Sequence, residues 1–448
     1  MKFSLYDFVC KTDEGYCIFN TFRTKYIKIN KEDEIKHFEE LINSEVLPAD
    51  DEMVKILYKE GFLVDSDFDE YALAKERIRR ISASHSDCLE FLVYTTEQCN
   101  FRCIYCPQEH LDNHLSDEKW ESIYKFVKRN IEEEGKKRVH IAFFGGEPLL
   151  KANKIISFLG KMKELNNKHN IEMMFHATTN GYLLTPNVYD QIASFDLPFS
   201  FQITLDGFAE SHNKTRVRVD GEGTWEKIVE NLKYINTKED KLSVTLRTNV
   251  GPENKDSMDG FYKWASETFN NKKFKFHIEE VAKYSDRVSD DVCCNATFEE
   301  LEQIRLQAAD TGKGDEARCF QILGGACPHS ISRFFAVAVN GTVYRCDNNH
   351  LYDESYDMPI GYFDDDGNME YTVDVDELET YEIDKCATCK VYPICAARAC
   401  PAQKMRDPVN RPDCLYKGSE LEETIVSKIN SGVIERLLRQ EMLHSRIV

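Results

Sequence analysis

Three closely spaced cysteines mark the stretch of this chain that is best equipped for chemistry. Cys99, Cys103 and Cys106 form the pattern C-x3-C-x2-C just after an apolar run at residues 89–95. Thiolates are soft ligands that select iron–sulfur clusters or zinc, and a structural zinc ion takes four ligands. The spacing therefore predicts a [4Fe–4S] cluster with one iron left open. The alternatives are a zinc knuckle completed by His110 and three unrelated buried thiols.

A second motif, Gly145-Gly146-Glu147-Pro148, directly follows the apolar run at residues 139–144. Two glycines allow a ligand or another segment to approach the backbone closely. A carboxylate beside them can accept charge-assisted hydrogen bonds from an ammonium group. The motif predicts a binding site at the end of a strand, and an ordinary turn is the alternative.

Both motifs resemble signatures of the radical S-adenosylmethionine (SAM) superfamily, in which an aromatic residue such as Tyr105 precedes the last cysteine. The resemblance implies that the open iron chelates the amino and carboxylate groups of SAM. It also implies that reduction of the cluster cleaves SAM to a 5′-deoxyadenosyl radical. By the same resemblance we expect Tyr105, Gly145, Gly146 and Glu147 to bind the cofactor.

Residues 202–207, with the sequence QITLDG, and Arg216 behind them resemble a strand of radical SAM enzymes that modify peptides and proteins. The anaerobic sulfatase-maturing enzymes are among these. The resemblance implies that Thr204 lies near the SAM ribose and that Arg216 pairs with the SAM carboxylate, which suits a guanidinium fork. Asn180, after the preceding strand, is expected to bind the cofactor with them. An ordinary surface arginine is the alternative for Arg216.

Eight further cysteines near the C-terminus resemble the SPASM domain, which holds two auxiliary [4Fe–4S] clusters. One departure is that four residues separate Cys395 from Cys400, where the family pattern has three. Two zinc sites of four cysteines are the alternative. The resemblance implies one ligand set of Cys319, Cys327, Cys346 and Cys400 and a second set of Cys386, Cys389, Cys395 and Cys414.

Asp347 directly follows the expected cluster ligand Cys346. In the sulfatase-maturing enzymes that this segment resembles, a carboxylate at this place acts as a base toward the substrate. Loss of a hydrogen atom from the substrate, followed by loss of a proton and an electron, suits a base beside a cluster. Asp347 is therefore the expected catalytic residue, and a carboxylate that only hydrogen-bonds near the cluster is the alternative.

The composition is typical of a globular, cytoplasmic chain. Of the 448 residues, 42% are hydrophobic and 30% are charged, and no apolar run approaches the roughly 18 residues of a membrane span. The N-terminus lacks a secretory signal, so the high cysteine content of 16 argues for metal or cluster ligation in a reducing cytoplasm and against a disulfide framework. A net charge of −21 argues against nucleic acid as a partner. Five cysteines outside the motifs are expected to be buried thiols: Cys10, Cys17, Cys88, Cys293 and Cys294.

The elements that must position these residues follow from periodicity. Six strand-like runs separated by amphipathic helices predict a parallel sheet with right-handed crossovers, a partial (β/α)6 barrel of the TIM-like kind. Chemistry in such barrels sits at the carboxyl ends of the strands, where each motif falls. Ser116 and Thr185-Pro186 are expected to begin helices. The strands are expected at residues 89–95, 139–144, 172–178, 200–205, 242–248 and 274–279.

The first eighty residues predict a small separate domain. Its pattern resembles the winged-helix-like RiPP recognition element, which binds the leader of a ribosomal peptide by adding it as a strand to a sheet edge. A structural cap on the barrel is the alternative. We expect strands at residues 6–10, 16–20, 25–29 and 61–64, helices at 32–43 and 50–59, and a helical linker at 70–82.

The sequence thus predicts an α/β protein with three domains. Residues 1–82 are expected to bind a leader peptide, residues 83–300 to form the radical SAM partial barrel, and residues 301–448 to form the SPASM domain with a closing helix at 420–443. The expected cofactors are SAM and three [4Fe–4S] clusters, one binding SAM and two auxiliary. The expected partners are a ribosomal precursor peptide and an electron donor such as flavodoxin or ferredoxin, with no nucleic acid and no membrane.

The resemblance implies a radical SAM/SPASM peptide maturase of the ranthipeptide or sactipeptide type. Such an enzyme abstracts a hydrogen atom from a precursor peptide and forms an intramolecular crosslink, here a thioether from cysteine to carbon. The alternatives are a carbon–carbon or ether crosslink, an anaerobic sulfatase-maturing enzyme that forms formylglycine, and a non-catalytic Fe–S scaffold that binds peptides.

Overall fold

The computed structural model describes residues 1–84, 87–283, 287–314, 334–345, 359–373, 384–394 and 418–430, with residues 432, 434 and 435. These residues belong to two compact units. The first unit contains residues 1–84 together with the C-terminal segments from 384 onward. The second contains the described residues from 87 to 373. The division of the chain into three domains is not tested by these two units and stays a prediction.

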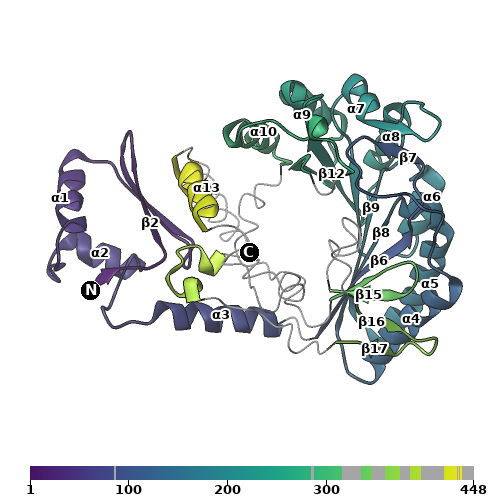
Figure 1. Ribbon diagram of the computed structural model, residues 1–448, viewed down its shortest axis with the longest axis horizontal. Helices are drawn as coiled ribbons and strands as arrows, with labels where there is room; N and C mark the ends of the chain where they lie inside the picture. The colour runs from purple at the N-terminus through teal and green to yellow at the C-terminus, as the bar shows by residue number, and fades with distance from the viewer. Residues whose placement is uncertain are drawn as a thin grey trace. The chain divides into compact units, whose positions relative to one another are not determined.

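The second unit is built on an open sheet in which six consecutive strands run parallel (Figure 1). Their order, β13-β12-β10-β9-β8-β6, follows the chain, as expected for repeated right-handed βα units. All six predicted strands are confirmed within a few residues, and the fold class is confirmed with them. The strands are β6 (Cys88–Thr96), β8 (Arg138–Gly145), β9 (Glu172–Thr179), β10 (Phe199–Thr204), β12 (Ser243–Val250) and β13 (Phe274–Glu280).

Helices cover one face of this sheet because alternate side chains of each strand are apolar (Figure 1). Phe91 of β6 packs on Phe126 of α4, with ring centroids 6.0 Å apart, and Phe143 of β8 packs on Phe158 of α5 at 6.1 Å. Residues between these, such as Glu90, therefore face the inner side. The helices are α4 (Asp117–Glu132), α5 (Ala152–His169), α6 (Pro186–Ala193), α7 (Ala209–Thr215), α8 (Trp225–Asn236), α9 (Met258–Thr268) and α10 (Phe298–Asp310).

The two predicted helix starts are confirmed by their capping bonds. The Ser116 side chain accepts a hydrogen bond from the backbone N–H of Lys119, and the Thr185 side chain accepts one from Val188, with Pro186 in the first turn. Among the described helices, none combines the length and apolar character that crossing a bilayer requires.

Four short strands extend the sheet beyond β6. β14 (Phe334–Val337) pairs parallel with β6, and β15 (Thr342–Tyr344), β16 (Pro359–Phe363) and β17 (Met369–Tyr371) follow as antiparallel neighbours. The sequence analysis did not predict them. They have only three to five residues each, so they carry little periodicity.

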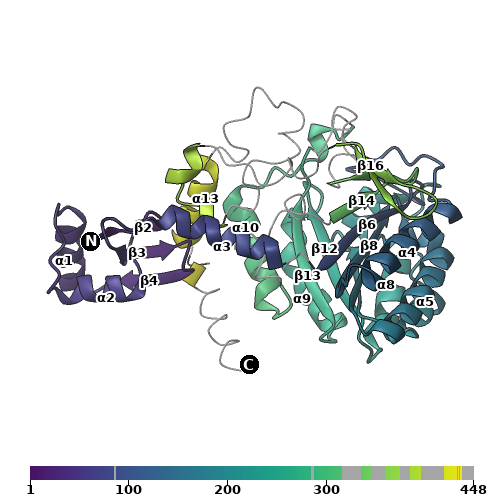
Figure 2. The ribbon, with the colours of Figure 1, turned by 90° about the horizontal axis from the view of Figure 1, so that it is seen from below.

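The first unit begins with the predicted small domain (Figure 2). β2 (Asp7–Thr12), β3 (Gly15–Asn20) and β4 (Lys25–Ile29) form an antiparallel sheet with β4 at one edge. α1 (Glu32–Ile42) and α2 (Glu52–Glu60) bury Phe38, Leu41, Val54 and Leu57 against it. β5 (Leu63–Val64) pairs with an unpredicted strand β1 (Lys2–Phe3), and α3 (Glu70–Ser84) follows.

C-terminal segments pack against this N-terminal domain. They are η8 (Asp384–Thr388), η9 (Tyr392–Ile394) and α13 (Gly418–Asn430), the last of which includes the start of the predicted closing helix. The Thr21 hydroxyl donates a hydrogen bond to the carbonyl of Lys390 at 2.6 Å. The rings of Tyr71 and Tyr392 lie 4.9 Å apart. Cys386 and Cys389 pack against the cluster formed by Tyr6, Ala74, Ile78 and Tyr392.

Asp7 is a buried carboxyl group of the first unit. Its Oδ1 accepts a hydrogen bond from Asn20 Nδ2 at 2.7 Å, while Oδ2 has no partner among the described residues. Burial raises the pKa of Asp7 to about 8, against the opposing Asn20 hydrogen bond and with support from the charge of Glu70. Folded Asp7 therefore keeps a proton that the unfolded chain releases.

We expect the stability of the first unit to fall as pH rises between about pH 4 and pH 8, because the unfolded state binds fewer protons there. The loss is at most about 1.4 kcal/mol per pH unit, or tenfold in hydrogen-exchange protection. Exchange of residues 7–20 in the full chain measures it. Asp7→Asn should remove this pH dependence. The control variant Asp13→Asn, which changes an exposed turn residue, should retain it. A pH dependence that survives in Asp7→Asn would contradict the assignment.

Candidate active site

The three cysteines of the predicted cluster line one cavity at the carboxyl ends of the parallel strands of the second unit. Cys99 follows β6, and Cys103 ends the short strand β7 (Phe101–Cys103). β7 pairs antiparallel with β11 (Arg216–Arg218), so Cys103 lies opposite Arg216. A turn then brings Cys106 N within 3.1 Å of the Cys103 carbonyl. This ribbon holds the three thiols in one loop.

The thiols are well suited to a cationic centre. Burial, followed by the charge of Glu147, raises the pKa of Cys99 to about 12, and burial raises the pKa of Cys103 to about 11. Without a cation the thiols are therefore protonated at neutral pH. An iron–sulfur centre would stabilise their thiolate forms. His110 also lines the cavity, with Nε2 3.4 Å from Cys106 Sγ, which is where the zinc-knuckle alternative would require it.

Gly145 and Gly146 bring the end of β8 against the cysteine loop. Gly145 has a φ of +127°, and a Cβ on it would lie 2.1 Å from the carbonyl of Thr96. A Cβ on Gly146 would lie 2.2 Å from the carbonyl of Gln98. Only glycine fits at either position, and Gly146 N donates to Thr96 O at 2.8 Å. Both glycines line the cavity.

Glu147 follows the two glycines, is fully buried and is not among the residues that line the cavity. Its Oε1 accepts hydrogen bonds from Thr179 Oγ1 at 2.6 Å and Leu149 N at 2.9 Å. Its Oε2 accepts one from Asn180 N at 2.7 Å. Burial raises the pKa of Glu147, and these three hydrogen bonds oppose that shift. The carboxylate thus joins the ends of β8 and β9, and its contact with an ammonium group stays a prediction.

The half-buried Tyr105, on the cysteine loop, is the centre of a polar network with buried partners. Its hydroxyl donates to Asp206 Oδ2 and accepts hydrogen bonds from Arg216 Nη1 at 2.7 Å and Asn249 Nδ2 at 3.1 Å. Asp206 Oδ1 accepts a further bond from Asn249 N at 2.8 Å. Arg216 Nη1 lies 4.0 Å from Asp206 Oδ2. The network joins the loop to β11 and to the ends of β10 and β12.

Arg216 is buried, which excludes the ordinary surface arginine among the alternatives. Burial lowers its pKa, but the charges of Tyr105, Cys103 and Asp206 raise the pKa above its usual range, so the guanidinium stays charged. Its Nε has no hydrogen-bond partner among the described residues, although the side chain lines the cavity. An unpartnered buried donor here fits a cavity built for an anionic group.

The same cavity brings together Thr204 and Asn180 with Tyr105 and Arg216, as expected for the cofactor-binding residues. Asn180 Nδ2 donates to Asn100 Oδ1 at 2.8 Å, which ties β9 to the cysteine loop. Sequence reasoning assigned no role to Asp206 or Asn249. Their positions at the carboxyl ends of β10 and β12 were the available signal.

The remaining expected site residues fall mostly outside the described part of the chain. The exceptions are Cys386 and Cys389, in and just after η8 of the first unit, where Cys389 N lies 3.3 Å from Cys386 O. Cys10, Cys17 and Cys88 are buried as expected, while Cys293 and Cys294 are partly exposed. Outside the described residues lie Asp347, Cys319, Cys327, Cys346, Cys395, Cys400 and Cys414.

Comparisons with known proteins give this chain relatives in one superfamily. Residues 93–265 match the model of the Radical SAM superfamily. A cysteine-type anaerobic sulfatase-maturating enzyme of Clostridium novyi (strain NT) is 27% identical over 332 residues, which cover 67% of this chain and 84% of that protein.

Two solved structures share the fold. Native anSMEcpe with bound AdoMet and Cp18Cys peptide aligns with a TM-score of 0.57 and 18% identity, covering 78% of this chain and 99% of that one. SuiB of Streptococcus suis bound to S-adenosylmethionine aligns with a TM-score of 0.50 and 14% identity, covering 89% of this chain and 95% of that one. At these identities the likeness concerns the fold.

We expect Tyr105→Phe to weaken SAM binding about tenfold while the iron content stays unchanged. Without the hydroxyl, Arg216 and Asp206 are free to pair directly, and the loss of one hydrogen bond to a charged group costs about 1.5–3 kcal/mol. Equilibrium dialysis with SAM measures the affinity. Tyr182→Phe is the matched control, because its hydroxyl accepts only from Arg218 at 3.1 Å among the hydrogen bonds described. Equal affinities in the two variants would contradict this role of Tyr105.

Proposed function

We propose that this chain, whose residues 93–265 form a radical SAM domain, is a peptide maturase that forms a thioether crosslink in a ribosomal precursor peptide. The substrate is a peptide whose leader binds the N-terminal domain and whose core reaches the cavity of the barrel. The product is a cysteine joined through sulfur to a carbon of the same peptide.

The observation that carries the proposal is the cavity at the carboxyl ends of the barrel strands. The loop with the three thiols lines it together with Gly145, Gly146, Thr204 and Arg216. Cys99, Cys103 and Cys106 would hold a [4Fe–4S] cluster and leave one iron without a protein ligand. Reduction of that cluster with SAM bound supplies a 5′-deoxyadenosyl radical.

The chain's own residues would orient SAM within this cavity. Arg216 is buried and charged, and its Nε lacks a hydrogen-bond partner among the described residues, so it is suited to the SAM carboxylate. Gly145 and Gly146 line the cavity and carry no side chain of their own, so their backbone groups can contact a ligand there. Thr204, at the end of β10, offers a hydroxyl for the ribose.

The crosslinking reaction requires an acceptor for electrons besides the radical. The peptide carbon loses a hydrogen atom to the 5′-deoxyadenosyl radical, and the cysteine thiol then loses its proton as the sulfur–carbon bond forms. One electron leaves in that step. We assign it to the auxiliary clusters expected on the C-terminal cysteines, from which flavodoxin or ferredoxin would remove it, and assign the proton to Asp347.

The N-terminal domain supports a peptide substrate with a leader. Its sheet ends at β4, whose outer edge can pair with an added strand. The likeness to SuiB covers 89% of this chain, whereas the likeness to anSMEcpe covers 78%.

Formylglycine formation on a sulfatase is the second candidate function. It is favoured by the 27% identity to the Clostridium novyi enzyme over two thirds of the chain. The two functions differ in the fate of sulfur. A thioether keeps the cysteine sulfur and loses two hydrogen atoms, whereas formylglycine replaces the sulfur by an aldehyde oxygen.

Mass spectrometry of the product separates these outcomes. The reconstituted chain is incubated anaerobically with SAM, a reductant and either the peptide encoded beside its gene or a sulfatase peptide. Loss of two hydrogen atoms from the precursor, with 5′-deoxyadenosine formed, supports crosslinking, and fragmentation locates the bond. Loss of sulfur from the sulfatase peptide favours the second candidate. SAM that stays intact with the clusters present favours a binding scaffold and contradicts both.

We expect replacement of Cys99, Cys103 and Cys106 by alanine to abolish formation of 5′-deoxyadenosine, because no open iron remains for SAM. Iron bound by the other cysteines should remain, and its content is measured in the same samples. Cys293→Ala provides the matched control, since Cys293 lies outside the cavity. Cleavage of SAM at the wild-type rate in the triple variant would refute the cluster assignment.

A proline scan of β4 tests leader binding. Consecutive residues of a strand direct their N–H groups to opposite edges, so of Tyr26→Pro and Ile27→Pro only one removes an outward-facing donor. That variant should keep the pairing with β3, lose less stability than the other and lose at least tenfold in affinity for the precursor. The other should lose stability because it breaks the pairing with β3. Wild-type peptide affinity in the stable variant would exclude this edge as the binding site.

A further inference from the structure

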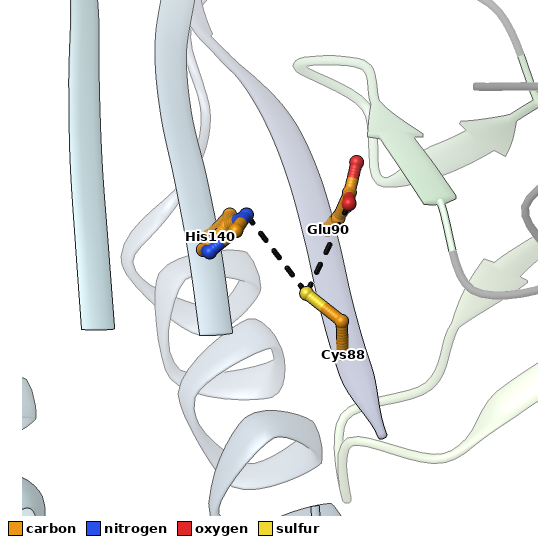
Figure 3. Close-up of side chains that lie close together, drawn as sticks. All are labelled: Cys88, Glu90 and His140. Atoms are coloured by element: carbon orange, nitrogen blue, oxygen red, sulfur yellow. Dashed lines mark hydrogen bonds between the residues drawn. The ribbon is translucent and has the colours of Figure 1, made fainter. Parts of the chain in front are cut away.

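We propose that Cys88, Glu90 and His140 form a second metal site, at the amino ends of the barrel strands, that binds a zinc ion. The three side chains lie together in Figure 3, where Cys88 stands between the other two. Their ligand atoms all lie within 4.8 Å of one another. This is the spacing of atoms that share one small cation.

Strand register brings the three residues together. Cys88 and Glu90 are two residues apart on β6, so they point to the same face of the sheet. His140 of β8 is the direct pairing partner of Glu90. Cys88 Sγ lies 3.9 Å from His140 Nδ1 and 3.9 Å from Glu90 Oε1. The arrangement is fixed by regular strands rather than by a loop.

The site lies on the inner face of the barrel. Phe91 follows Glu90 on β6 and packs on α4, so its side chain points toward the helices. Cys88 and Glu90 therefore point to the opposite face of the sheet. β6 has nine residues, which places its two ends about 26 Å apart. The site is therefore remote from the thiols that follow the carboxyl end. Cys88 and Glu90 also precede residue 93, where the superfamily match begins.

The donor set indicates the metal. A thiolate, an imidazole and a carboxylate are the three ligand types that zinc takes, with a water molecule or another exchangeable ligand in the fourth position. Calcium and magnesium prefer sets made of oxygen alone. Sulfur and nitrogen at 3.9 Å are near the separation of two ligands around a tetrahedral zinc ion.

His140 differs from the neighbouring histidine on the same inner face. His176 of β9 is bonded at both ring nitrogens, to Ser200 Oγ at 2.8 Å and Thr178 Oγ1 at 3.2 Å. The His140 ring has only the long contact with sulfur at Nδ1, and its buried Nε2 has no partner among the described residues. His140 Nδ1 therefore has no short hydrogen bond to another described residue, and a metal ion beside Cys88 Sγ would give this nitrogen a partner.

Zinc content measured beside iron content tests the site. The full chain, with its clusters reconstituted anaerobically, is dialysed against Zn²⁺ and analysed by mass spectrometry of the elements. Wild type should carry one zinc per chain more than Cys88→Ser and His140→Gln at equal iron content. His176→Gln and Cys10→Ser, which alter a half-buried histidine and a buried thiol elsewhere, should keep that zinc. Equal zinc in wild type, Cys88→Ser and His140→Gln overturns the proposal.

A second readout covers the case in which a variant folds poorly. Co²⁺ replaces Zn²⁺ in such sites and gives a charge-transfer absorption band when a thiolate is bound. The difference between the absorption spectra of wild type and Cys88→Ser should show this band. Glu90→Gln keeps the thiol, so it should weaken Co²⁺ binding at least tenfold but still show the band at saturating Co²⁺. Added Zn²⁺ should raise the melting temperature of wild type but not of His140→Gln. Absence of both the band and the shift overturns the proposal.

Discussion

The cysteine loop depends on one interaction, in which the buried Arg216 donates a hydrogen bond to the Tyr105 hydroxyl and that hydroxyl donates to Asp206. A buried guanidinium is costly unless it is paired and hydrogen-bonded, and Tyr105 and Asp206 supply that partner. The pairing brings residues 111 positions apart together and places β11 beside β7. The three thiols can therefore surround one centre only when the barrel strands that carry Asp206 and Asn249 have formed.

This dependence explains how far the sequence could predict the site. The six strands were predicted because each buries one apolar face and the periodicity is local. The cysteine and glycine motifs could be recognised because each is a short run of neighbouring residues. The β7–β11 ribbon and the roles of Asp206 and Asn249 were missed, since they rest on pairings between distant segments. The position of Glu147 at the end of a strand was predicted, but the three hydrogen bonds that it accepts within the protein were not.

The first unit was likewise predicted only in part from the sequence. Its strands and helices follow the sequence closely, yet periodicity gave no sign that residues 384–394 would pack on them. Thr21 and Lys390 are 369 positions apart and share a hydrogen bond, and Cys386 and Cys389 contact the same apolar cluster as Tyr6. If the N-terminal domain binds a leader, the same compact unit contains two of the expected auxiliary-cluster ligands. Peptide binding and the C-terminal cysteines would then be coupled through packing rather than through a linker.

The two ends of the barrel strands hold their cysteines by different physical means. At the carboxyl end the thiols are on a loop, so their geometry has to be imposed by the Arg216 network and by glycines that admit close backbone contact. At the amino end Cys88, Glu90 and His140 lie within regular strands, and the register of β6 and β8 alone sets their separation. A site of the second kind requires little ordering when a ligand binds, because strand pairing has already fixed its backbone. A loop site can adjust to a reacting cofactor, whereas a strand site is suited to a metal ion that stays bound and ties the two strands together.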